Sequence, residues 1–147
     1  MSDKGEEKAT VVHIAPTPFF ADRGCHIRIR NEIDALRGHP YRIVLCTYHH
    51  GRSVDGIDIR RIPPIPGYTK LDAGYSPFRF LADFLLLLLV FKTVWQERPG
   101  LLHCHLHEGA LIGWLVAKCL FWRKMAIVMD MQGSLSGELA AYKAFGA

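Results

Sequence analysis

The sequence lacks the cysteine patterns that build disulfide frameworks or zinc ribbons. Its 147 residues include four cysteines, at positions 25, 46, 104 and 119, and no two of them form a C-x-x-C pair. This spacing predicts reduced thiols, which are typical of a cytosolic protein. The first ten residues are polar and precede no apolar signal-peptide core, so we do not expect export.

The sequence also lacks an apolar run of the roughly 20 residues that a membrane-spanning helix needs. The segment Phe78–Trp95 comes nearest, but Asp83 and Lys92 interrupt it, and its longest unbroken apolar stretch is Phe84–Phe91. We therefore predict a helix buried in a protein core. A helix that lies against a membrane surface is the alternative, and a spanning helix is the least favoured interpretation.

Internal repeats, a dinucleotide-binding G-x-G-x-x-G motif and a basic helix face are absent as well, so nucleic acid is not an expected partner. Half of the residues are hydrophobic and 22% are charged, a balance typical of one globular domain. The net charge of +4 and the isoelectric point of about 9.0 favour anionic partners such as phosphates, nucleotide-sugars or acidic lipids.

What the sequence does contain is an alternation of strand-like and helix-like segments after a polar tail at residues 1–9. This alternation predicts, for residues 10–147, an α/β domain with a Rossmann-like, mostly parallel sheet and helices on both faces. The predicted strands are 10–15, 41–47, 56–62 at an edge, 101–106 and 125–131. The predicted helices are one that ends at Gly38, 78–96, 108–121 and one that starts near Glu138.

Ligands of such sheets bind beyond the carboxyl ends of the strands, where the strand order reverses. The loops after residues 15, 106 and 131 are therefore the expected places for chemistry. Gly24 lies between the first strand and the first helix. A glycine lets the backbone approach a ligand closely, and a helix amino terminus favours an anion. A plain turn into the helix is the alternative interpretation.

A cluster of histidines ends the fourth predicted strand. On a strand, His103, His105 and His107 would share one face, and three imidazoles can ligate zinc or iron, as in a metal-dependent hydrolase. Histidines at this position also serve as hydrogen-bonding groups in a ligand crevice. We favour the crevice, which Glu108 would border, and we expect no metal.

A second polar cluster ends the last apolar strand. A buried Asp130 costs free energy unless it is paired, so it is either a substrate-binding carboxylate or the partner of backbone amides or of a cation. Ser134 or Ser136 is a candidate helix cap, and Glu138 is favoured near a helix amino terminus.

These pieces, in this order, resemble the amino-terminal domain of the family-4 glycosyltransferases, which have the two-domain GT-B fold. Gly24 with its helix, followed by L-R-G-H at 36–39, is similar to the family's first loop, helix and turn. P-G-L-L-H-C-H at 99–105 resembles its P-D-(I/V)-(I/V)-H-A-H strand, and I-V-M-D-M-Q-G-S-L at 127–135 resembles its V-V-x-T-x-H-G-S-L segment. The resemblance covers about residues 11–139.

Three positions depart from the family pattern. Gly100 replaces the usual aspartate, Asp130 stands where the family often has threonine, and Gln132 replaces a histidine that helps to position the donor sugar. Either Asp130 and Gln132 perform that role here, or the usual chemistry is altered.

The resemblance implies the acceptor-side half of a retaining enzyme that transfers a sugar from a nucleotide-sugar to a glycan or lipid-linked acceptor, with no metal or other cofactor. It implies catalytic positions for Asp130 and Gln132, and substrate or donor contacts for Gly24, His105, Glu108, Gly133, Ser134 and Glu138. We expect the carboxyl-terminal donor domain, in cis or as a separate chain, to be required for activity.

The expected location is cytoplasmic, with peripheral contact at the inner face of the cell membrane as a further hypothesis. Two other functions stay open on the sequence alone. The first is a non-catalytic or degenerate binding domain, and the second is the histidine-based hydrolase.

Overall fold

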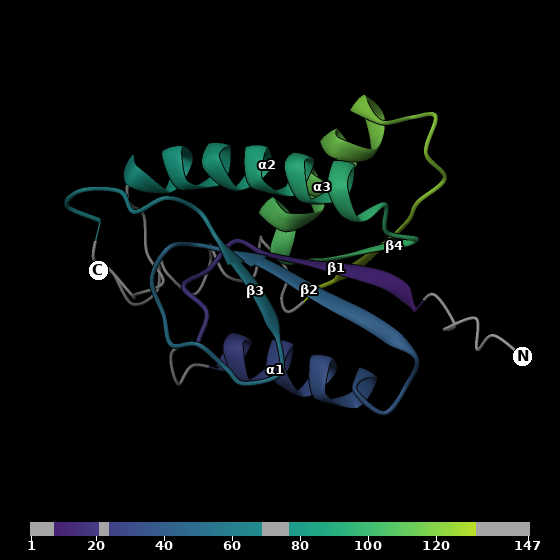
Figure 1. Cartoon of the computed structure of the whole chain (residues 1–147). Coiled ribbons are helices and arrows are strands. Elements are labelled where there is room, and N and C mark those ends of the chain that lie inside the picture. Colours follow the sequence, from purple (N-terminus) through teal and green to yellow (C-terminus); the bar gives the residue numbers. More distant parts are fainter. Residues whose placement is uncertain (1–7, 21–23, 69–76, 132–147) are drawn as a thin grey trace, which may run out of the picture.

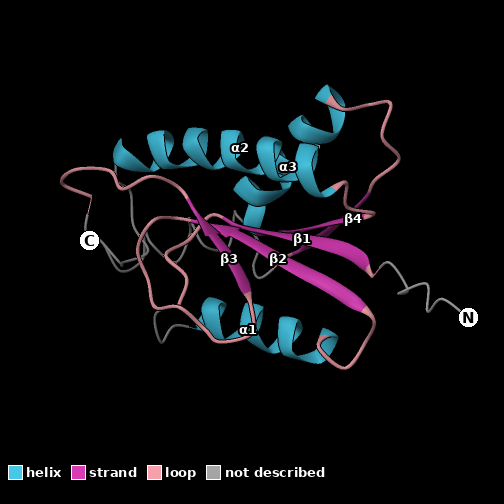
Figure 2. Cartoon of the chain, in the orientation of Figure 1, coloured by secondary structure: helices cyan, strands magenta, loops and turns pink. Residues whose placement is uncertain are grey.

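The computed structural model describes residues 8–20, 24–68 and 77–131. Within them, a parallel sheet of order β3-β2-β1-β4-β5 is covered by helices on both faces, with α1 on one side and α2 and α3 on the other (Figures 1 and 2). The strands are β1 (Ala9–Ala15), β2 (Tyr41–Thr47), β3 (Asp58–Arg61), β4 (Leu101–His105) and β5 (Ala126–Asp130). The helices are α1 (Gly24–Leu36), α2 (Pro77–Glu97) and α3 (Leu106–Cys119). The predicted Rossmann-like α/β fold is confirmed.

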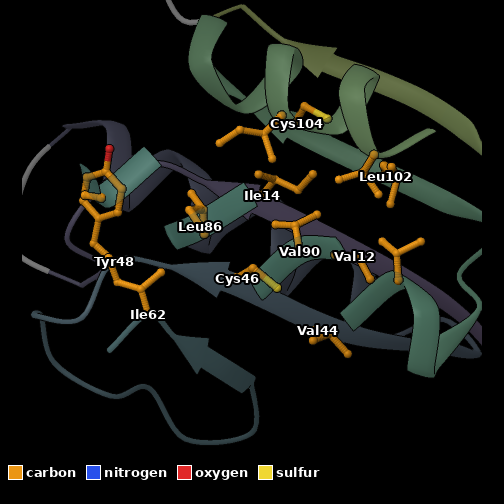
Figure 3. Packing of buried hydrophobic residues seen from close by; sticks show 14 of the residues in the cluster. Val12, Ile14, Val44, Cys46, Tyr48, Ile62, Leu86, Val90, Leu102 and Cys104 are labelled. Atoms are coloured by element: carbon orange, nitrogen blue, oxygen red, sulfur yellow. The ribbon is translucent and has the colours of Figure 1, made fainter. Parts of the chain in front are cut away.

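The two faces of the sheet bury different side chains because successive strand residues point to opposite sides. Val12 and Val44 belong to the larger core under α2 and α3, where Figure 3 shows them with Leu86 and Val90 of α2. Leu45, the neighbour of Val44, instead joins the smaller core with α1. One apolar layer therefore lies on each side of the sheet.

Helix α2 is a core helix on one of its sides, as the sequence predicts. Ala82, Leu86, Val90 and Val94 recur every fourth residue and are fully buried. Among the described residues, no helix has the length and apolar character to cross a membrane.

The junction between β4 and α3 differs from the prediction of a strand to residue 106 and a helix from residue 108. Helix α3 begins at Leu106, directly after β4, so no loop separates the two elements. Leu106 has a φ of 62°, in the left-handed region, which lets one residue redirect the chain. All four cysteines lie within the described residues, and no disulfide joins any two of them there. The helix predicted near Glu138 lies outside the described residues.

Candidate functional site

The strand order reverses between β1 and β4. The chain places β2 and β3 on one side of β1, and β4 and β5 on the other. His13 of β1 pairs in register with His103 of β4, and His105 pairs with Asp130 of β5. A cluster of polar side chains therefore lies at the topological switch point, where open α/β sheets bind ligands.

Three imidazoles form the centre of this cluster. The ring centroid of His103 lies 4.7 Å from that of His13 and 4.6 Å from that of His105. Nδ1 of His13 lies 3.0 Å from Nε2 of His105, and both side chains are fully buried. One proton occupies this contact, and the tautomers of the two rings decide which nitrogen donates it.

The sequence predicted that His103, His105 and His107 share one face of a strand, and this prediction is wrong for His107. His107 lies on α3 and not on β4, because the strand ends at residue 105. His13 takes its place, from a strand 90 residues earlier in register with His103. Only the pairing of β1 with β4 brings these rings together, and no local spacing in the sequence reveals that pairing.

Two carboxylates and one guanidinium complete the cluster. Asp130 Oδ1 accepts a hydrogen bond from Arg28 Nη2 at 2.6 Å, and Asp130 Oδ2 lies 3.5 Å from His105 Nδ1. Glu32 Oε1 accepts from Arg28 Nε at 3.2 Å, while its Oε2 lies 3.4 Å from His103 Nε2. Arg28 therefore holds one oxygen of each carboxylate and leaves the other oxygen facing the imidazoles.

Sequence reasoning found Asp130 and His105 but did not select Arg28 and Glu32. Both are polar residues off the apolar stripe of α1, and such residues are usually solvated. Their i, i+4 spacing was a signal that they share one helix face, although it gave no sign of where that face points. The cation partner considered for Asp130 is thus Arg28.

Burial sets the charge state of the two inner histidines. Desolvation lowers the pKa of His105 to about 4, with help from His103 and against the opposing effect of Asp130. Desolvation, with smaller contributions from His105 and His103, also lowers the pKa of His13 well below its usual value. Both rings are therefore neutral near pH 7 and offer nitrogen lone pairs to a ligand.

The loop after β1 is tied to its surroundings. Thr17 Oγ1 lies 2.6 Å from Nε2 of His26, near the start of α1, and the hydroxyl of Thr47 donates to the carbonyl of Thr17 at 2.5 Å. These bonds link the ends of β1 and β2 to the start of α1. Gly24 is the first residue of that helix, and a Cβ there would meet no heavy atom within 4 Å, so crowding does not demand a glycine.

Glu108 is not part of the histidine cluster. It lies in the first turn of α3 and accepts a hydrogen bond from Arg79 Nη2 of α2 at 2.5 Å. Tyr48 donates to Asp83 of α2, which forms a second polar contact on this side of the sheet. Burial, with the nearby carboxylate of Asp83, raises the pKa of Tyr48, so its hydroxyl stays protonated.

The other predicted site residues, Gln132, Gly133, Ser134 and Glu138, lie outside the described residues. The chain matches no family model, and a search of curated proteins finds no match. The chemistry of the histidine and carboxylate cluster and the sequence resemblance are therefore the two indications of function.

Proposed function

We propose that this chain forms the acceptor-side domain of a glycosyltransferase that moves a sugar from a nucleotide-sugar to a glycan or lipid-linked acceptor. The observation that carries the proposal is the position of His105 and Asp130. A buried, neutral imidazole and a carboxylate held by Arg28 lie side by side at the switch point of a parallel sheet.

In this proposal, polar side chains orient the sugar. Asp130 accepts a hydrogen bond from a sugar hydroxyl, and its ion pair with Arg28 holds the carboxylate in place. The buried His105 supports Asp130 through the contact of its Nδ1 with Oδ2, and Gln132 is the second catalytic residue that the resemblance implies. The amino terminus of α1, at Gly24, faces the diphosphate, whose negative charge a helix amino terminus favours.

The transfer breaks the bond between the anomeric carbon and the diphosphate oxygen and forms a bond to the acceptor oxygen. The acceptor proton leaves with the departing diphosphate, so the step needs no added acid, metal or cofactor. The protein contributes orientation and preorganised dipoles.

The exposed edge of the sheet favours a partner domain. Within the part of the chain that the structure describes, β5 is an edge strand, and Ile127, Val128 and Met129 are 40%, 47% and 37% exposed. Parallel sheets are normally covered on both faces, and an uncovered apolar edge is a pairing site for further chain. We expect the donor domain to complete this side, in cis or as a separate chain.

A second surface supports peripheral contact with a membrane. On the side of α2 opposite the core, large apolar side chains recur along one face and form what we call the outer stripe. Its members are Phe80, Phe84, Leu88, Phe91 and Trp95. They are 38–69% exposed, whereas a surface helix of a globular protein normally carries polar residues on its outer face.

The charges around the outer stripe favour an anionic lipid surface. The acidic residues of α2 and α3 are engaged elsewhere: Asp83 with Tyr48, Glu97 with two arginines, and Glu108 with Arg79. The exposed charged residues on these helices and the turns that follow them are basic, namely Lys92, Arg98, Lys118 and Lys124. We propose that this face docks on the inner face of the cell membrane, near a lipid-linked acceptor.

The test of the transferase proposal compares the 147-residue chain alone with the same chain expressed with its flanking coding sequence, where we expect the donor domain. Transfer of radiolabel from UDP-, GDP- and ADP-sugars to lipid and glycan extracts is measured. We expect transfer only in the second case, because the donor contacts lie in the other domain. Transfer by the short chain alone would contradict this division of roles.

Asp130→Asn links the activity to the cluster. We expect a loss in kcat of about 100-fold or more, because a preorganised charged contact is removed. His107→Ala, a histidine change close by but outside the cluster, should retain activity. Binding of a nucleotide-sugar without transfer in the longer protein would instead favour the non-catalytic binding domain.

A further inference from the structure

Two carboxylate oxygens and one imidazole nitrogen lie within 4.8 Å of one another between α1, β4 and β5, on Glu32, Asp130 and His105. Glu32 Oε2 lies 3.4 Å from His103 Nε2 and 3.8 Å from His105 Nδ1. His105 Nδ1 in turn lies 3.5 Å from Asp130 Oδ2. Ligand atoms that share a tetrahedral zinc ion lie about 3.3 Å apart, because each metal–ligand bond is about 2.0–2.1 Å long. Small side-chain shifts would therefore suffice to bring Glu32 Oε2, His105 Nδ1 and Asp130 Oδ2 around one ion.

Hydrogen bonds alone leave this arrangement incomplete. Glu32 Oε2 is buried and has no hydrogen-bond partner among the described residues. His105 Nδ1 faces this oxygen and the Oδ2 of Asp130, and an ionised carboxylate only accepts hydrogen bonds. A neutral imidazole has one N–H, so Nδ1 of His105 can donate to only one of the two carboxylates. A divalent cation would satisfy the facing oxygens and the nitrogen together.

The surrounding groups match those that support ligands in metal sites. Arg28 binds the outward oxygen of each carboxylate, Oε1 of Glu32 and Oδ1 of Asp130, and so fixes the orientation of the inward one. His13 bonds to Nε2 of His105, which leaves Nδ1 of that ring directed toward the carboxylates. Metal-bound histidines are typically held through their second nitrogen in this way.

We propose that Glu32, His105 and Asp130 bind one divalent first-row transition-metal ion, with His13 and Arg28 as supporting residues. Imidazole nitrogen and carboxylate oxygen are ligands that suit zinc, and three protein ligands leave one coordination position open. The inference goes beyond the proposed sugar transfer, for which no metal is required. Because Asp130 belongs to both sites, the ion and a sugar would compete for it.

The test uses the full 147-residue chain, freed of metal with a chelator. Zinc is titrated by calorimetry, and cobalt is titrated by its visible absorption, which reports the coordination geometry. We expect one ion per chain. Glu32→Gln and Asp130→Asn keep the side-chain shapes and should each abolish stoichiometric binding. His107→Ala is the matched control and should bind as the unaltered chain does.

The supporting role of His13 has its own readout. His13→Leu removes the partner of His105 Nε2 and should weaken binding by about 10–100-fold. In His13→Asn, an amide oxygen can replace Nδ1 as acceptor, so part of the affinity should return. Far-UV circular dichroism shows whether each variant is folded.

A folded chain that binds neither zinc nor cobalt would overturn the inference. Binding that is lost in His107→Ala but kept in both carboxylate variants would do the same. Metal binding without sugar transfer would remove only the transferase proposal, and transfer by a protein that binds no metal would remove only this inference.

Discussion

His105 has no exposed surface, and its neighbours are two imidazoles and two carboxylates. Its pKa of about 4 in the folded chain is below its ordinary value of 6.5, and the pKa of His13 is also lowered. At pH values between about 4 and about 6.5, the unfolded chain binds more protons at these histidines than the folded chain does. The free energy of unfolding therefore falls as the pH drops below about 6.5. We expect a loss of about 1.4 kcal/mol per pH unit for each of the two protons.

Urea unfolding at several pH values between about pH 7 and about pH 5 measures how the free energy of unfolding depends on pH. His105→Asn removes one of the two groups and should flatten the pH dependence by about one proton. His39→Asn removes an exposed histidine outside the cluster and should keep the full slope. A stability that does not change over this range would contradict the neutral, buried state of the rings.

At the residue scale, the sequence identified some residues of the polar cluster but not the residues that they contact. Asp130 and His105 were selected because polar residues at the end of an apolar strand need a reason to be there. His13 was not selected, since a single histidine inside a β-rich run has no local signal of function. Its contact with His105 spans 92 residues and exists only after β1 pairs with β4.

Helix α3 lies close to the sheet because it presents a glycine to it. A Cβ on Gly113 would lie 2.5 Å from Cys104 Sγ and 3.4 Å from Ile14 Cδ1. We expect Gly113→Ala to destabilise the protein by about 1–3 kcal/mol, since the added methyl overpacks a filled core. Thermal or urea unfolding measures the change.

The cause of that destabilisation can be isolated with a double-mutant cycle. Cys104→Ala removes the sulfur nearest to the added methyl group. In that background Gly113→Ala should cost little, because alanine is favoured over glycine in a helix by about 1 kcal/mol. Additive effects of the two changes would mean that the close approach is not the cause.

At the scale of elements, the periodicity of apolar residues predicted the positions of strands and helices that local patterns encode. The bounds of β2 match the prediction, and the long helix was placed within one residue at each end. The start of α3 was missed because it depends on the left-handed backbone of Leu106, which a leucine rarely adopts. No composition or period in the sequence marks such a position.

At the scale of the whole molecule, the two faces of the sheet carry different features. Helix α1 covers one face of the sheet, and α2 and α3 cover the other (Figure 1). The histidine and carboxylate cluster lies on the α1 side, whereas α2 exposes the outer stripe on the other side. The sequence indicated a surplus of apolar residues in α2, but an inner and an outer face can be told apart only once the sheet is in place. In the proposed function, that separation lets one domain face a substrate on one side of the sheet and a lipid surface on the other.

We therefore expect the folded protein to co-sediment with vesicles that contain anionic phospholipid and to bind little to neutral vesicles. Each well-placed basic side chain, such as Lys118 or Lys124, adds about 1 kcal/mol near an anionic surface, and salt should weaken the binding by screening.

The variant with Phe84→Ser and Leu88→Ser should lose about tenfold or more in affinity, since two apolar side chains no longer enter the interface. Ile27→Ser removes a similarly exposed apolar residue from α1, on the opposite side of the sheet, and should bind as the unaltered protein does. Equal absence of binding to both kinds of vesicle would exclude the membrane, and equal losses in the two serine variants would show that the outer stripe is not the docking surface.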